Sequence, residues 1–244
     1  MRPILVLWDV DGTLIDDGAV GEAVYPFAFE RLTGRPARHR VASAGRTELD
    51  VMAELFARHG VDGFEPHRVG AELTAQLRRR AAELRTAGRV LPGAVEALQA
   101  LRARPGVTQS VLTGNLRANA ALKLGLFGLA EFVDLGVGAY GDDARERAAL
   151  LPVARRRAAA VRGRHFDAGS TVLVGDTPQD VRAGLAGGSR VVAVASGASS
   201  GAVLRAAGAD AVLPDLRDTA AVVRAVVRAP GTVHAPGPAV RSGR

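Results

Sequence analysis

The chain has 244 residues, of which 48% are hydrophobic and 23% charged, with a formal net charge of +7. This composition is sufficient to bury a core and excludes a disordered chain, while apolar runs of only strand length exclude a membrane-spanning helix. Because the sequence contains no cysteine, disulfides, thiol catalysis and cysteine-ligated metals are also excluded, and any metal must be bound by oxygen or imidazole ligands.

The positive charge does not by itself predict nucleic-acid binding. The arginines are scattered along helix-like segments, where a solvated helix face explains them, and aromatic residues make up only 4% of the chain. The first apolar run is too short for a secretory signal. We therefore expect a cytoplasmic protein, a monomer or homodimer, that binds neither nucleic acid nor a membrane.

The chain opens with a continuous apolar run at residues 4–8, which is typical of a central parallel strand covered on both faces. Three amphipathic segments then follow with no strand between them, and helices are predicted at residues 21–32, 47–59 and 71–84. This order indicates a helical cap, residues 16–89, inserted after the first strand.

From residue 90 onward, apolar strands alternate with helices. Strands are expected at residues 108–112, 132–136, 171–174, 190–194 and 211–213, and helices at 93–102, 116–124, 146–161, 178–186 and 200–207, before a last helix. The pattern predicts an α/β fold with a doubly wound parallel, Rossmann-like sheet, whose core comprises residues 1–15 and 90–228. Residues 229–244 are rich in proline and glycine and are expected to form a flexible tail.

Polar side chains follow three of these strands, at residues 9–13, 113–115 and 175–180. Ligands bind at the carboxyl ends of parallel strands, so these groups should meet at one edge of the sheet. Asp9 and Asp11 leave the first strand on a turn that Gly12 can make tight, and Asp176 and Asp180 arrive from a neighbouring strand. Crowded carboxylates require a cation, and Mg²⁺ prefers such oxygen ligands and neutralises phosphate.

The segment Asp-Val-Asp-Gly-Thr-Leu at residues 9–14 resembles the first motif of the haloacid dehalogenase superfamily of aspartate-nucleophile hydrolases. The second motif of that family falls on Thr113, and the fourth on Gly175, Asp176 and Asp180. The resemblance covers roughly residues 4–220, and a helical cap at this place is similar to the phosphoglycolate phosphatase and β-phosphoglucomutase-like branch.

The third motif departs from the family pattern, which usually has a lysine. The chain has a single lysine, Lys123, and it lies on a different helix. Arg147 is the expected substitute, because Pro152 follows it where the family motif often has a later proline, and Arg145 is the alternative. An arginine keeps the charge and adds a planar fork suited to phosphate.

The resemblance implies a role for each of these residues. Asp9 would be the nucleophile that forms an aspartyl-phosphate, and Asp11 would protonate the leaving group and then activate water. Thr113, Asn115 and Arg147 would hold phosphate oxygens. The alternatives are that Thr113 and Asn115 are only turn residues.

The same resemblance implies a Mg²⁺ site formed by Asp176, one oxygen of Asp9 and the backbone carbonyl of Asp11. Asp180 would support the site by orienting the third-motif cation or a metal-bound water, with Gly12 and Gly175 as further supporting residues. The competing interpretation of Asp180 is a helix cap.

Arg46 lies in a cap segment, residues 43–47, that resembles the one relatives place over the active site. A cap arginine favours a small phosphorylated metabolite with a second anion, and phosphoglycolate is the best single candidate. A phosphosugar mutase of the same branch and a non-catalytic binding protein remain as alternatives.

Overall fold

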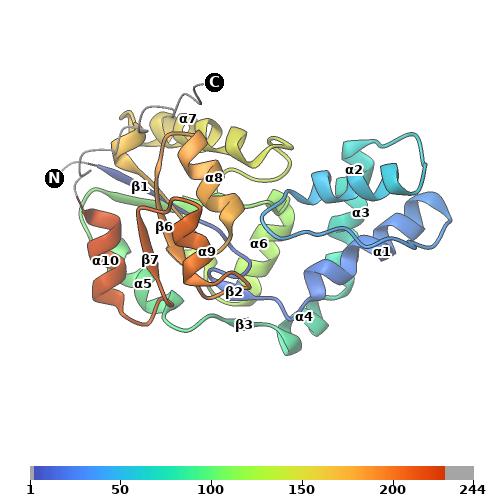
Figure 1. Ribbon diagram of the computed structural model, residues 1–244, viewed down its shortest axis with the longest axis horizontal. Coiled ribbons are helices and arrows are strands. Elements are labelled where there is room, and N and C mark those ends of the chain that lie inside the picture. The colour runs from blue at the N-terminus through green and yellow to red at the C-terminus, as the bar shows by residue number, and fades with distance from the viewer. Residues whose placement is uncertain (1–2, 229–244) are drawn as a thin grey trace, which may run out of the picture.

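The computed structural model describes residues 3–228, so the expected flexible tail at 229–244 lies outside the described residues. Its centre is a five-stranded parallel sheet in the order β4-β1-β5-β6-β7, which confirms the predicted α/β fold (Figure 1). The strands are β1 (Ile4–Trp8), β4 (Val107–Val111), β5 (Thr171–Gly175), β6 (Arg190–Val194) and β7 (Ala211–Leu213).

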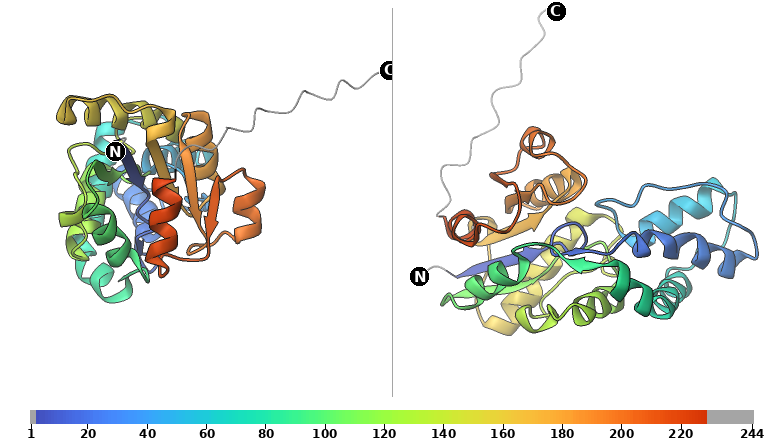
Figure 2. Two further views of the ribbon diagram at one scale, coloured as in Figure 1. Left: turned by 90° about the vertical axis from the view of Figure 1, so that its left-hand side faces the viewer. Right: turned by 90° about the horizontal axis from the view of Figure 1, so that it is seen from below.

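Helices cover both faces of the sheet (Figure 2). One face packs against α5 (Ala94–Arg102), α6 (Arg117–Leu126) and α10 (Thr219–Val227). The opposite face packs against α7 (Leu150–Arg162), α8 (Pro178–Ala186) and α9 (Gly201–Ala206). None of the described helices is long and apolar enough to cross a membrane.

Strand β1 is apolar throughout because its side chains alternate between two separate cores. Trp8 packs on one face with the cluster under α5 and α10, while Leu7 packs on the other with the cluster under α7. Both side chains are fully buried. A strand buried on both faces gains from an apolar residue at every position, which places β1 at the centre of the sheet.

A group of four helices extends from one end of the sheet (Figure 1). These helices are α1 (Val20–Thr33), α2 (Glu48–Arg58), α3 (Pro66–Arg79) and α4 (Ala81–Ala87), and they have an apolar core of their own. The chain enters this cap through β2 (Ile15–Asp16) and returns through β3 (Arg89–Val90), which pair as a short antiparallel ladder. The two crossings therefore lie side by side, as in a hinge.

Two expected elements differ in the structure. The strand predicted at 132–136 is a 3₁₀ turn, Ala130–Phe132, followed by a bend in which Asp134 Oδ1 accepts a hydrogen bond from Gly136 N at 3.0 Å. That side-chain bond closes the segment into a turn. The segment therefore meets β4 through single contacts, the bond from Asp134 N to the Gln109 carbonyl at 2.9 Å and an isolated bridge between Ala139 and Leu112, and not through a strand ladder. The helix predicted at 71–84 is broken at Arg80, and the break turns α4 toward β3.

Gly93 provides a test of the packing between the sheet and its helices. It begins α5 with a φ of 84°, and a Cβ there would lie 2.2 Å from the backbone of Leu216. Gly93→Ala should lower the free energy of unfolding by about 2–5 kcal/mol, through the left-handed conformation and the backbone clash together. Urea unfolding measures this change.

The matched control is Gly163→Ala. Gly163 has a φ of 63°, and a Cβ added there would meet nothing within 4 Å. Its cost should be only that of the left-handed conformation, about 1–2 kcal/mol. Equal losses in the two variants would contradict the backbone clash.

Candidate functional site

The carboxyl ends of β1, β4 and β5 bring the predicted residues together at one edge of the sheet. Asp9 continues the register of β1 by donating its backbone N–H to the Val174 carbonyl at 2.8 Å. Thr113 and Asp176 follow the neighbouring strands β4 and β5. All three side chains are buried. The parallel sheet order, with β1 between β4 and β5, is what places these loops side by side.

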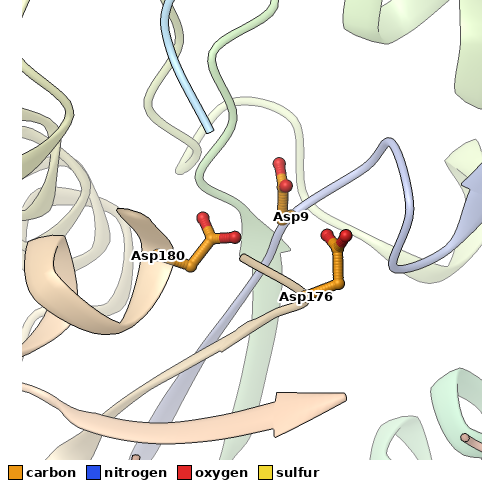
Figure 3. A group of neighbouring side chains, drawn as sticks. All are labelled: Asp9, Asp176 and Asp180. Atoms are coloured by element: carbon orange, nitrogen blue, oxygen red, sulfur yellow. The ribbon is translucent and has the colours of Figure 1, made fainter. Parts of the chain in front are cut away.

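Three carboxylates form a compact buried group at this edge. Oxygen atoms of Asp9, Asp176 and Asp180 lie within 4.8 Å of one another. Figure 3 shows that the three side chains come from the end of β1, from the loop after β5 and from the first turn of α8, and that they converge. The group is close enough for one cation to contact more than one of its members.

Burial raises the pKa of two of these carboxyl groups. The pKa of Asp9 rises from 3.8 to about 7, mainly through burial and further through the nearby Asp180 and Asp11, while Arg147 opposes the rise. The pKa of Asp176 rises to about 8, again mainly through burial and then through Asp9 and Asp180. A bound cation would favour the ionised forms and reverse these shifts.

The surroundings of Asp176 leave room that only glycine can provide. A Cβ at Gly12 would lie 2.4 Å from Asp176 Oδ2, and one at Gly197 would lie 1.9 Å from the same atom. Thr13 Oγ1 donates a hydrogen bond to Asp176 Oδ1 at 3.1 Å. The backbones of Gly12 and Gly197 thus approach Asp176 Oδ2 closely, and the donor atoms of the three carboxylates are all oxygen, which fits a hard divalent cation.

Arg147 is the buried cation of this group. Its Nη2 lies 2.8 Å from Asp9 Oδ1 and 2.6 Å from Asp180 Oδ1, and it begins the 3₁₀ turn Arg147–Ala149 that precedes α7. Burial lowers the pKa of Arg147, but the attraction of Asp180 and Asp9 outweighs this and the net shift is upward. Arg145 is exposed and pairs instead with Asp50 of the cap at 3.2 Å.

Asp180 is held in place by the start of α8. It accepts hydrogen bonds from Thr177 N at 3.0 Å and from Thr177 Oγ1 at 2.6 Å, and its own N–H donates to Thr177 Oγ1. A Cβ at Gly175 would lie 2.5 Å from Asp180 Cγ, so glycine is needed there. Asp180 is therefore both part of the capping box of α8 and an ion-pair partner of Arg147.

Thr113 and Asn115, which follow β4, connect the end of that strand to Asp11. Asn115 Nδ2 donates to Thr113 Oγ1 at 2.8 Å and to Asp11 Oδ2 at 2.7 Å. The Asn115 backbone N–H also bonds to Thr113 Oγ1 at 3.2 Å. One amide nitrogen of Asn115 thus connects the Thr113 hydroxyl to the Asp11 carboxylate.

Lys123 joins the site although the sequence interpretation placed no role on it. Its Nζ lies 2.7 and 2.8 Å from the two oxygens of Asp11 and 3.0 Å from Asp17 Oδ2. Burial lowers the pKa of Lys123, but the attraction of Asp11, Asp17 and Glu48 outweighs it and the net shift is upward. The available signal was a lone lysine on the same apolar helix face as Ala120 and Leu124 in a chain otherwise rich in arginine.

A pocket of about 320 Å³ lies between the core and the cap and contains these groups. Its cap side includes Glu22, Tyr25, Arg46 and Glu48. The guanidinium of Arg46 already contacts Asp50, by Nε at 2.8 Å and Nη2 at 2.7 Å, and also contacts Glu54. The charge of Arg46 is therefore balanced within the cap.

Glu48 is a buried carboxyl on the same side of the pocket. Its Oε2 accepts hydrogen bonds from Leu116 N at 2.9 Å and from Asn119 Nδ2 at 2.8 Å, which attaches α2 of the cap to the start of α6. Burial is the main cause that raises its pKa from 4.5 to about 7, against the lowering influence of Lys123.

The sequence matches the model of one protein family. A family model described as haloacid dehalogenase-like hydrolase matches residues 6–184. No curated protein matches the sequence significantly.

Solved structures share the fold at low identity. A hydrolase from Pseudomonas syringae is 19% identical with a TM-score of 0.68, over 91% of this chain and 98% of that one. A protein described as a predicted phosphatase from Clostridium acetobutylicum is 18% identical with a TM-score of 0.66, over 92% and 100%. CbbY from Rhodobacter sphaeroides, in complex with phosphate, is 19% identical with a TM-score of 0.65, over 89% and 96%.

The raised pKa of Glu48 predicts a pH dependence of stability. Between pH 4.5 and about 7 the folded state binds more protons than the unfolded state, so the free energy of unfolding falls as the pH rises through this window. Glu48→Gln removes the charge while its amide oxygen can still accept both hydrogen bonds. The loss between pH 5 and pH 8 should shrink by on the order of 2 kcal/mol in urea unfolding.

Glu96→Gln is the control, because Glu96 is exposed on α5. It should keep the pH dependence of the wild type. An unchanged pH dependence in Glu48→Gln would contradict the raised pKa of the Glu48 carboxyl group.

Proposed function

Because the chain belongs to the haloacid dehalogenase-like hydrolase family, we propose that it is a Mg²⁺-dependent phosphatase of small phosphate monoesters that forms an aspartyl-phosphate on Asp9. The observation that carries this proposal is the buried group of Asp9, Asp176 and Arg147 at the strand ends. It combines a nucleophile, oxygen ligands and a phosphate-binding cation in one place. A cytoplasmic location and a monomeric or homodimeric state stay predictions from the sequence.

In the proposed first step, a carboxylate oxygen of Asp9 attacks phosphorus and the bond to the leaving alcohol breaks. Asp11 donates the proton that the leaving oxygen needs. In the second step Asp11 takes a proton from water, whose oxygen attacks phosphorus and releases inorganic phosphate and free Asp9. The hydrogen bond from Asn115 to Asp11 supports this pairing of roles, because it holds the acid–base group beside the strand ends.

The phosphoryl oxygens would be held by Thr113, Asn115 and Arg147. Nε of Arg147 is buried and makes no hydrogen bond to any residue among 3–228. Unsatisfied buried donors are rare and require an explanation, which an anionic oxygen bound nearby would supply. The Asp180 carboxylate would fix the guanidinium plane, so Arg147 needs no reorientation when the phosphoryl group arrives.

Mg²⁺, held by Asp9, Asp176 and the Asp11 backbone carbonyl, would neutralise the charge on the phosphoryl group. A cation there would favour the ionised forms of Asp9 and Asp176, whose pKa values burial raises, and the proposed roles need these ionised forms.

The size of the pocket supports a small metabolite as substrate. Phosphoglycolate remains the best single candidate from the sequence, and Arg46 would bind its carboxylate. Arg46 already pairs with Asp50 and Glu54. To bind the carboxylate of phosphoglycolate, its guanidinium must therefore break its contact with one of these two residues.

The first experiment is a phosphate-release screen over small phosphorylated metabolites with Mg²⁺ and with chelator. Asp9→Asn should keep the fold, because the amide is nearly isosteric and Asp180 still pairs with Arg147, but lower kcat by at least about a thousandfold. Circular dichroism checks the fold, and Mg²⁺ should be required for wild-type turnover.

Retention of more than about a hundredth of wild-type kcat in Asp9→Asn would refute the nucleophile, and full activity in chelator would refute the metal. An isomerised sugar phosphate without phosphate release would identify the mutase alternative. No turnover of any ester would favour a binding protein.

Arg147 should contribute more to kcat than to KM, because its charge acts on the transferring group. Arg147→Ala should lower kcat by about 10²–10³-fold, while Arg147→Lys should fall between this variant and the wild type because lysine is shorter and has no fork. Steady-state kinetics of phosphate release measure both parameters.

Arg145→Ala is the matched control, because that side chain is exposed and pairs with the cap. Its kcat should stay within about threefold of the wild type. A crippled Arg145→Ala beside an active Arg147→Ala would overturn the assignment.

A further inference from the structure

Lys123 is the most unusual charged residue outside the family motifs. Its side chain is only 2% exposed, and burying an ammonium group is costly unless it is well paired. It is paired with two carboxylates, Asp11 before β2 and Asp17 after it. The pairing offsets the cost of burial, and it also ties α6 to two acidic groups that lie on either side of β2.

The contact with Asp11 engages the whole carboxylate. Lys123 Nζ approaches both oxygens, at 2.7 and 2.8 Å, and Asn115 Nδ2 holds Oδ2 from another direction at 2.7 Å. The Asp11 side chain is 37% exposed, so packing alone does not hold it. Its orientation therefore depends on these two donors, and Lys123 is the charged one.

The contact with Asp17 connects the same ammonium group to the cap. Asp17 lies between β2 and α1, where the chain enters the cap. Its Oδ1 accepts a hydrogen bond from Ala19 N and its Oδ2 accepts one from Gly21 N, both at 3.1 Å. Asp17 thus fixes the first turn of α1 while it contacts Lys123.

Gly21 supplies an independent sign that this close approach is required. A Cβ at Gly21 would lie 2.3 Å from Asp17 Oδ2 and 3.1 Å from Lys123 Nζ. A side chain at that position would displace the ion pair or move α1 away from the core. The start of the cap is built to pack directly on the Lys123–Asp17 contact.

We propose that Lys123 is a positioning residue that orients the Asp11 carboxylate for proton transfer and, through Asp17, couples this orientation to the hinge of the cap. The inference rests on the proposed phosphatase function. Movement of the hinge would shift Asp17 relative to Lys123. The ammonium group would then move, and the Asp11 carboxylate that it contacts would change its orientation.

The test compares two leaving groups. An aryl ester such as p-nitrophenyl phosphate needs little protonation by Asp11, whereas an alkyl ester needs it fully. The value of kcat/KM covers only the steps up to departure of the alcohol, so the alkyl-to-aryl ratio of kcat/KM isolates proton donation from the later attack of water. The alkyl substrate is the ester that the wild-type enzyme hydrolyses best in the screen.

Lys123→Met should lower this ratio by about tenfold or more, through kcat for the alkyl ester, and Lys123→Arg should keep it closer to the wild type. Asp17→Asn leaves Lys123 in place and should lower the ratio about two- to fivefold. If Lys123 transmits the effect of the hinge, Asp17→Asn should change nothing further in the Lys123→Met background. Asp17→Asn also tests the inference if Lys123→Met fails to fold.

Arg155→Met is the control for a loss of stability that does not involve Asp11. Arg155 donates to Thr171 Oγ1 and to the carbonyls of Gly187 and Gly188, on the far side of the sheet from α6. It should lower stability and leave the ratio within about twofold of the wild type.

Three results would overturn the inference while the phosphatase stands: an unchanged ratio in Lys123→Met, an unchanged ratio in Asp17→Asn, or an equal fall in Arg155→Met. Wild-type protein that releases no phosphate from any alkyl ester would refute the proposed function and this inference with it.

Discussion

The buried ion pairs of Arg147 with Asp9 and Asp180 are the interaction on which the rest of the site depends. Three carboxylates lie within 4.8 Å of one another in a region where burial opposes charge. One guanidinium, from the turn before α7, contacts two of them. Removal of either partner of such a pair would leave an uncompensated buried charge, so the strand ends, the first turn of α8 and the start of α7 are mutually constrained.

A second buried cation, Lys123, pairs with two carboxylates on the side of the site that faces the cap. Lys123 contacts Asp11 and Asp17, whereas Arg147 contacts Asp9 and Asp180. The two carboxylates of the first motif therefore have different partners, although they are only two residues apart. The two chemical roles proposed for them require different environments, and the two cations supply this difference.

The α/β fold, its parallel sheet and the membership of the hydrolase family were predictable from local patterns. A continuous apolar run predicts a strand buried on both faces, and polar residues after strand ends predict a site at the carboxyl edge. Local patterns failed where a side chain competed with the backbone. The hydrogen bond from Gly136 N to Asp134 converts an apolar segment into a turn, and the apolar periodicity around Leu73 and Leu84 does not reveal the break at Arg80.

The sequence by itself determined which strands are buried, where glycine permits tight turns, and which acidic residues leave the strand ends together. Only the tertiary structure decided which charges meet. Lys123 and Asp11 are 112 residues apart in the chain. Arg46, Arg145 and Arg147 are equally charged in the sequence, yet the first two pair with carboxylates of the cap while the third is buried among carboxylates of the core. Long cationic side chains can reach many positions, and their partners are selected by the packing of distant elements, which no local pattern encodes.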